Sequence, residues 1–162
     1  MRFTLHTDYG LRVLLYAAAH PERVVTTTEI SAAYGISKHH LVRVAQSLRD
    51  GGYLELKTGR SGGLVLARDP DEISIGAVVR ALEPDLRLVE CFDPATSTCP
   101  IAPVCGLSGA LRDARDAFLA VLDRVSLKQA LGKGSPVGHF LPVDRMVGRA
   151  RARRRPGAVR RA

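Results

Sequence analysis

The sequence predicts a mainly α-helical protein with a small β-wing, namely a winged helix-turn-helix followed by a long dimerisation helix. Three observations lead to this fold class. Two short helical segments are joined by a tight glycine turn, a glycine-rich hairpin follows them, and apolar residues later recur every three or four positions. We expect a DNA-binding domain over residues 1–68, a linker helix, cysteine loop and dimerisation helix over 69–132, and a basic, disordered tail over 133–162.

The first two helices are marked by apolar spacing and by a capping motif. Apolar residues at helical spacing predict a first helix over residues 7–19. Thr26 and Glu29 have the spacing of a capping box, which predicts that a second helix begins at Thr27. Gly35 is expected to end that helix after Tyr34.

The third predicted helix carries the candidate DNA-reading face. It is expected to be capped by Ser37 and to run to about Asp50, with a polar and basic side opposite its apolar one. The second helix of a helix-turn-helix enters the major groove, so its free side should meet base edges. The apolar side is Leu41, Val44, Ala45 and Leu48. The candidate DNA contacts of the two helices are Thr28, Ser37, Lys38, His39, His40 and Arg43.

A β-hairpin is expected directly after these helices. Residues 53–57 and 64–66 have strand character and flank a glycine-rich turn over 58–63. A hairpin in this place is typical of a wing, and Arg60 near its tip is a candidate contact to a minor groove or a phosphate.

Two further helices are expected in the second half of the chain. Ser74 should cap a helix over residues 75–83, which Pro84 ends. From Leu107 on, a seam about 28 Å long is predicted, which favours a homodimer; packing of this helix on its own winged helix is the alternative. The seam positions are 107, 111, 114, 118, 121, 122 and 125.

Charge and composition narrow the function classes. The net charge of +8 comes from the tail over 133–162, which has nine Lys/Arg against one acid, while residues 1–132 carry fifteen of each. The tail could add non-specific DNA affinity or reflect only an arginine-rich genome. No apolar run suits a membrane helix and three cysteines suit a reducing compartment, so we expect a soluble cytoplasmic protein. No phosphate loop or nucleophile–base pair is found, so we do not expect an enzyme.

The three cysteines are the candidate metal ligands. Cys91, Cys99 and Cys105 are spaced C-x7-C-x5-C in one proline-punctuated loop, which indicates an Fe–S cluster or zinc. The spacing is wider than the paired C-x2-C of most structural zinc sites, which favours iron–sulfur. Three thiolates leave a four-iron cluster one ligand short. Candidates for the fourth ligand are Asp93 in the loop and His6, Asp8 and Glu90 elsewhere.

Four of these features together resemble the Rrf2 family of bacterial regulators. They are Thr-Asp-Tyr-Gly-Leu-Arg at residues 7–12, the turn between Glu29 and Ser37, the Gly-Arg-Ser-Gly-Gly wing at 59–63, and the three-cysteine loop. The resemblance covers residues 1 to about 131 and is greatest to the nitric-oxide-sensing branch. A sister branch has a histidine ligand three residues after the last cysteine, where this chain has Ser108.

The resemblance implies a homodimeric repressor that binds double-stranded DNA, at a palindromic operator, and releases it when nitric oxide attacks its cluster. It implies a [4Fe-4S] cluster on Cys91, Cys99 and Cys105, with Asp8 of the other subunit as fourth ligand; a [2Fe-2S] cluster is the alternative. Two other functions stay open: a zinc-binding or thiol-redox regulator on the same fold, and a protein-interaction module that does not bind DNA.

Overall fold

The computed structural model describes residues 2–59 and 62–132, so Arg60 and the basic tail over 133–162 lie outside the described residues. The first part of the chain forms α1 (Leu5–Ala18), α2 (Thr27–Tyr34), α3 (Lys38–Asp50), β1 (Leu54–Lys57) and β2 (Gly63–Leu66). The second part forms α4 (Ile75–Leu82), two 3-10 turns, η1 (Glu90–Phe92) and η2 (Ala102–Val104), and then α5 (Gly106–Asp123) and α6 (Leu127–Leu131). No helix in these ranges is long and apolar enough to cross a membrane.

The helix-turn-helix forms where the sequence predicts it. Both hydrogen bonds of the capping box join Thr26 and Glu29, and Gly35 ends α2 in the left-handed region at φ 67°. The prediction for Ser37 is partly wrong, because its side chain makes no capping hydrogen bond. The first turn of α3 is held by the backbone instead, with Leu41 N–H donating to Ser37 O at 3.1 Å.

The wing and the three helices share one apolar core. β1 and β2 pair antiparallel with Leu54 opposite Leu66, and Val25 adds a short bridge to Leu64. α1 lies in the middle of this part and begins two residues earlier than predicted, because Thr4 caps it. The fully buried aliphatic side chains of this core include Val13, Leu14, Ile30, Leu41 and Leu48.

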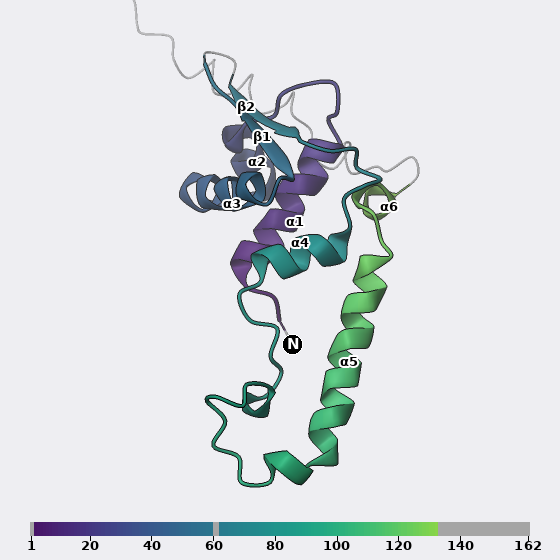
Figure 1. The fold of residues 1–162 in the computed structure, drawn as a ribbon. Helices are drawn as coiled ribbons and strands as arrows, with labels where there is room; N and C mark the ends of the chain where they lie inside the picture. The colour runs from purple at the N-terminus through teal and green to yellow at the C-terminus, as the bar shows by residue number, and fades with distance from the viewer. Residues whose placement is uncertain (1, 60–61, 133–162) are drawn as a thin grey trace, which may run out of the picture.

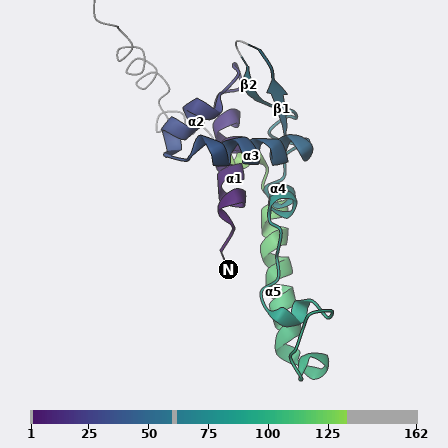
Figure 2. The ribbon, with the colours of Figure 1, turned by 90° about the vertical axis from the view of Figure 1, so that its left-hand side faces the viewer.

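α4 joins the two parts of the molecule through two close helix crossings. A Cβ at Gly10 of α1 would lie 2.2 Å from Leu82 Cδ1, so α1 and α4 approach at a residue without a side chain. A Cβ at Gly76 would lie 2.7 Å from the backbone nitrogen of Asp123, at the end of α5. Arg80 strengthens the contact between α4 and α5 through a bidentate ion pair with Asp123 (Nη2 to Oδ2 2.8 Å). From this joint, α5 projects away from the winged helix in both views (Figures 1 and 2).

The structure corrects the predicted seam of α5. The helix ends at Asp123 and a separate capping box at Ser126 begins α6, so the seam does not continue to residue 125 as one helix. The one buried side chain of α5 is Leu119, which the seam left out. The predicted seam combines two faces: Leu122, one turn after Leu119, packs with it on the chain's own core beside α4, whereas Leu107 (66% exposed) and Val121 (52% exposed) face outward.

Candidate functional site

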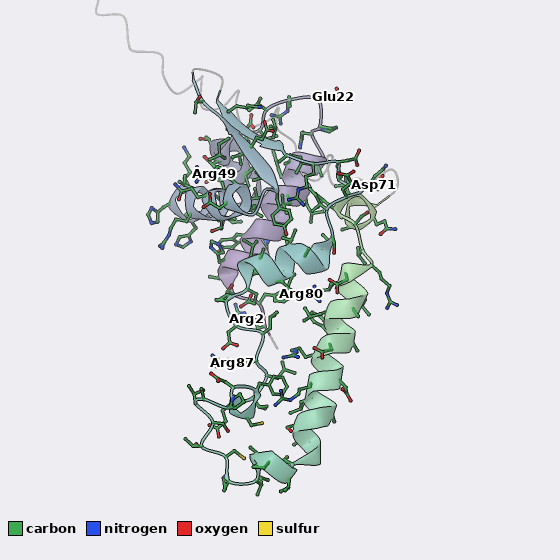
Figure 3. All side chains as sticks on the ribbon, in the orientation of Figure 1. Arg2, Glu22, Arg49, Asp71, Arg80 and Arg87 are labelled. Atoms are coloured by element: carbon green, nitrogen blue, oxygen red, sulfur yellow. The ribbon has the colours of Figure 1, made fainter. Side chains whose placement is uncertain are left out.

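The three cysteines lie on one loop at the far end of α5. Cys91 is in η1, Cys99 is in the extended stretch that follows, and Cys105 is the residue before α5 begins. All three are half-buried free thiols. Figure 1 shows this loop at the end of α5 away from the winged helix, and Figure 3 shows sulfur atoms there with Arg87 beside it. The loop therefore presents three soft ligands outside the DNA-binding part.

Both ends of the loop are fixed to α5 through cysteine carbonyl groups. Arg112 Nη2 donates to Cys91 O at 3.2 Å, and Ser108 Oγ donates to Cys105 O at 3.0 Å. The Arg112 guanidinium also lies over the ring of the buried Phe92, 4.9 Å from its centroid. These contacts place the two outer cysteines against a single helix.

Asp93 is already fully engaged within the loop. Its carboxylate accepts hydrogen bonds from the Ala95 amide (3.0 Å), from Thr96 Oγ1 (3.0 Å) and from Arg87 Nη1 (2.7 Å). The Ala95 amide hydrogen bond, with the Thr96 and Arg87 contacts, lowers the pKa of Asp93 below its ordinary value. Arg87 is held in turn by Asp85. Asp93 thus stabilises the loop and is a poor candidate for the fourth ligand.

The thiols do not converge as ligands in this structure. Among residues 2–59 and 62–132, no three His, Cys, Asp or Glu side chains form a group able to hold a metal ion. The donor set itself fits a thiolate-bound metal or cluster, because three unpaired thiols occur within fifteen residues of a loop anchored at both ends. The loop would need to close further to bind such a group.

Asp8 lies in the first turns of α1. The start of α1 is separated from the cysteine loop of the same chain (Figure 1). Its carboxylate pairs with Arg12 at 2.8 Å, and both side chains are partly exposed. Of the other candidates for a fourth ligand, His6 is hydrogen-bonded to Ser47 (3.1 Å) and Glu90 accepts from Thr98 at 3.4 Å. Within one chain, none of these three joins the thiols in a group able to hold a metal ion.

The predicted DNA-reading residues gather on the exposed side of α2 and α3. The exposed ones are Thr28, Ser37, Lys38, His39, His40 and Arg43. His40 does not turn into the core; its ring stacks beside that of Tyr9, with the centroids 6.2 Å apart. Val42 also lies on this surface and is 44% exposed. It was not predicted because it is apolar, although its position between His39 and Arg43 would have indicated it.

A polar cavity of about 420 Å³ lies next to this surface, between α1 and α3. It was not expected from the sequence, because its walls come from two helices far apart in the chain. Its lining includes His6, Tyr9, His40, Arg43 and Ser47. The cavity therefore connects the neighbours of Asp8 with the DNA-reading side of α3.

This arrangement defines a class of protein: a winged helix-turn-helix with a basic reading helix, joined to a helix that carries a cysteine loop, is a DNA-binding transcriptional regulator. The chain belongs to the Rrf2 family, whose description is iron-dependent transcriptional regulator and whose model matches residues 3–133. The family membership confirms the expectation of a regulator and not an enzyme.

Named relatives agree with this assignment. The chain is 46% identical to the HTH-type transcriptional regulator NsrR of Bacillus subtilis (strain 168), over 79% of this chain and 88% of that protein. It is 47% identical to the NsrR of Geobacillus kaustophilus (strain HTA426), over 81% and 90%. The solved structure of CymR, the global cysteine regulator of B. subtilis, superposes with a TM-score of 0.64 at 26% identity, over 79% of this chain and 94% of that one.

Proposed function

We propose that this chain is a homodimeric cytoplasmic repressor that senses nitric oxide through an Fe–S cluster. Cys91, Cys99 and Cys105 would hold a [4Fe-4S] cluster, with Asp8 of the partner subunit as the fourth ligand; a [2Fe-2S] cluster is the alternative. In this proposal residues 1–68 bind DNA, and residues 69–132 bind the cluster and form the dimer. The observation that carries it is the anchored loop of three free thiols in a member of this family.

The geometry favours a fourth ligand that comes from a second chain. Phe3, just before α1, meets α5 at Phe118, with ring centroids 5.9 Å apart. Phe118 comes thirteen residues after Cys105, which is about 20 Å along a helix. Cys105 is thus far from Phe3 along α5, and within one chain Asp8 joins no group of ligands with the thiols among the described residues. A second copy packed on the exposed apolar side of α5 could bring its loop to Asp8.

The neighbours of Asp8 provide a route from the cysteine loop to the reading helix. His6 is hydrogen-bonded to Ser47 of α3, Tyr9 stacks beside His40 of α3, and Gly10 packs against Leu82 of α4. A bound cluster supplies irons that react with nitric oxide, and a carboxylate oxygen is its weakest ligand. An Asp8 carboxylate that no longer served as a ligand would pair with Arg12, and α1 would then be free to shift with α3.

Such a shift explains how DNA binding would be lost. A dimer reads two half-sites about 34 Å apart, one helical turn of DNA, so the two reading helices must keep a fixed separation. A palindromic operator would match the twofold symmetry of the dimer. Movement of α1 and α3 relative to α5 changes this separation, and the repressed genes would be expressed.

Anaerobic purification with iron, sulfide and visible-absorbance measurements tests the cluster. We expect about four irons and four sulfides per chain and bleaching by nitric oxide. The Cys99→Ala protein, in which the substitution lies outside the buried core, should be colourless. A wild-type protein that holds zinc or no metal after strictly anaerobic work would contradict the proposal and favour the zinc or thiol-redox alternative.

DNA binding is tested separately with operator fragments selected from random duplexes. Affinity should fall steeply with salt, because phosphate contacts release counterions. Lys38→Ala and Arg43→Ala should each weaken binding by about tenfold, and Glu55→Ala on β1 should not. A wild-type protein without salt-dependent DNA affinity would favour the protein-interaction module.

A further inference from the structure

We propose that Arg112 is a positioning residue of the cysteine site. It fixes Cys91 to the same face of α5 that fixes Cys105, so that the two outer thiols approach a bound group together. This inference rests on the proposed function only in its second step, the binding of a cluster.

One face of α5 holds both cysteine carbonyl groups. Ser108 and Arg112 are four residues apart and are therefore neighbours on the helix surface. Ser108 Oγ donates to Cys105 O at 3.0 Å and Arg112 Nη2 donates to Cys91 O at 3.2 Å. The backbone positions of Cys91 and Cys105, fourteen residues apart in the chain, are thus set by adjacent side chains of a rigid element.

The position of the Arg112 guanidinium is fixed by the ring of Phe92. Phe92 is 8% exposed, and the Arg112 and Arg115 guanidinium carbons lie 4.9 Å and 5.1 Å from its centroid. A planar guanidinium can stack on a ring and donate at its edge at the same time, whereas a lysine ammonium cannot make both contacts in this geometry. Arg115 differs in an informative way, because it stacks on Phe92 but pairs with Asp116 and not with a cysteine.

Besides Arg112, α5 supports the Cys91 turn through the ring contact of Arg115 with Phe92, but among the described residues only Arg112 donates a hydrogen bond to Cys91. Between the ends of the loop the chain has no helix longer than the three residues of η2, and Pro94, Pro100 and Pro103 interrupt it. The hydrogen bonds of Cys99 are local, to Ser97 and Ala102. Without the Arg112 tie, binding of three thiols to one group would have to order this loop as well, which costs conformational entropy.

The first test uses the full-length protein without metal. Hydrogen–deuterium exchange is measured for the peptide over residues 89–99, where the amides of Phe92 and Asp93 donate within the η1 turn. Arg112→Gln and Arg112→Lys should speed this exchange by about tenfold, since each loses a hydrogen bond and a ring contact. Arg115→Gln, the matched control, should change it much less. Equal exchange in wild type and both Arg112 variants would overturn the proposal.

The second test uses the reconstituted cluster and its visible absorbance. Loss of absorbance to excess EDTA should be about tenfold faster in Arg112→Gln and Arg112→Lys than in wild type or Arg115→Gln. Wild-type stability of the cluster in Arg112→Lys would show that positive charge suffices and would overturn the positioning role. A wild-type chain that takes up no cluster would contradict the proposed function, while the exchange experiment would still decide whether Arg112 holds the Cys91 turn.

Discussion

The carboxylate of Asp8 is held by Arg12 on its own helix, so any other partner of Asp8 competes with this ion pair. Arg12 also lies over the ring of Tyr34, 5.7 Å from its centroid, which keeps the guanidinium between α1 and α2. An exposed pair four residues apart in a helix contributes only about 0.3–0.5 kcal/mol to stability. Asp8 can therefore exchange partners at small cost to the fold.

Substitution of Asp8 should separate sensing from folding. The Asp8→Ala protein should lose the dependence of DNA binding on nitric oxide, measured by anaerobic gel shift with and without a nitric oxide donor. Its free energy of unfolding should change by less than about 1 kcal/mol. Arg12→Gln is the control, because it breaks the same ion pair but keeps the carboxylate, and it should stay responsive. Normal nitric oxide response in Asp8→Ala would remove Asp8 from the site.

At the residue scale, the sequence indicates candidate residues for the chemistry but not the contacts that hold them in place. The cysteines and the basic residues of α3 stand out by type and spacing. Ser108 donates to the nearby carbonyl of Cys105, but the role of Arg112 depends on the carbonyl of Cys91, twenty-one residues away, which no local pattern reveals. The spacing of four residues between Ser108 and Arg112 was a signal in the sequence that both lie on one face of a helix. Only the structure shows that the loop folds against that face.

The joint between α4 and α5 depends on a glycine. Gly76→Ala should destabilise the protein by about 1–3 kcal/mol, because the added Cβ would approach the Asp123 backbone to 2.7 Å and force the helices apart. Gly109→Ala in α5 should instead stabilise it by up to about 1 kcal/mol, since nothing lies within 4 Å and alanine favours a helix. Urea denaturation measures both. Equal changes in the free energy of unfolding for Gly76→Ala and Gly109→Ala would contradict the close approach of α4 and α5 at Gly76.

The same joint should respond to acid. The Arg80 hydrogen bonds lower the pKa of Asp123 below its ordinary value of 3.8, so the folded state favours the ionised form. The ion pair therefore stabilises the fold above about pH 4 and is lost as the pH falls through the lowered pKa. The melting temperature of Asp123→Asn should thus depend less on pH between about 5 and 2 than that of wild type. Arg80→Gln should reduce the pH dependence of the melting temperature equally. If both variants keep the pH dependence of wild type, the Arg80–Asp123 ion pair does not stabilise the fold.

Element by element, capping chemistry predicted more than periodicity did. α2 begins at its capping box and ends at Gly35 as predicted, because those signals act over four or five residues. α3 also has the predicted bounds, although the side chain of Ser37 makes no capping hydrogen bond. The apolar spacing of α5 predicted an exposed seam but could not separate it from the face that packs on the chain itself. The predicted seam therefore included Leu122 and omitted Leu119, although both pack on the chain's own core.

At the scale of the whole molecule, α5 presents apolar side chains that its own chain leaves exposed. Leu107, Phe118 and Val121 lie on one side at helical spacing, beside an apolar cavity of about 370 Å³ that also touches Phe3 and Leu88. This is the surface that we expect a second copy to cover.

If a second copy covers this surface, a charge placed there should prevent dimerisation. Val121→Glu should give a monomer at micromolar concentration by analytical ultracentrifugation, and its affinity for a two-half-site operator should fall by at least about 100-fold. Ala120→Glu lies next in sequence but on a different side of the helix, and it should stay dimeric. A dimeric Val121→Glu protein with normal affinity would show that the chains associate elsewhere.

The separation between Asp8 and the cysteine loop of the same chain also has a genetic consequence. If each site takes its cysteines from one chain and Asp8 from the other, an allele lacking Asp8 and an allele lacking Cys99 each remove a different part of the site. Cells that carry both alleles form mixed dimers, and each mixed dimer contains one intact site and one without either contribution. Two inactive copies should therefore partly restore regulation together, which is complementation between mutations in a single gene.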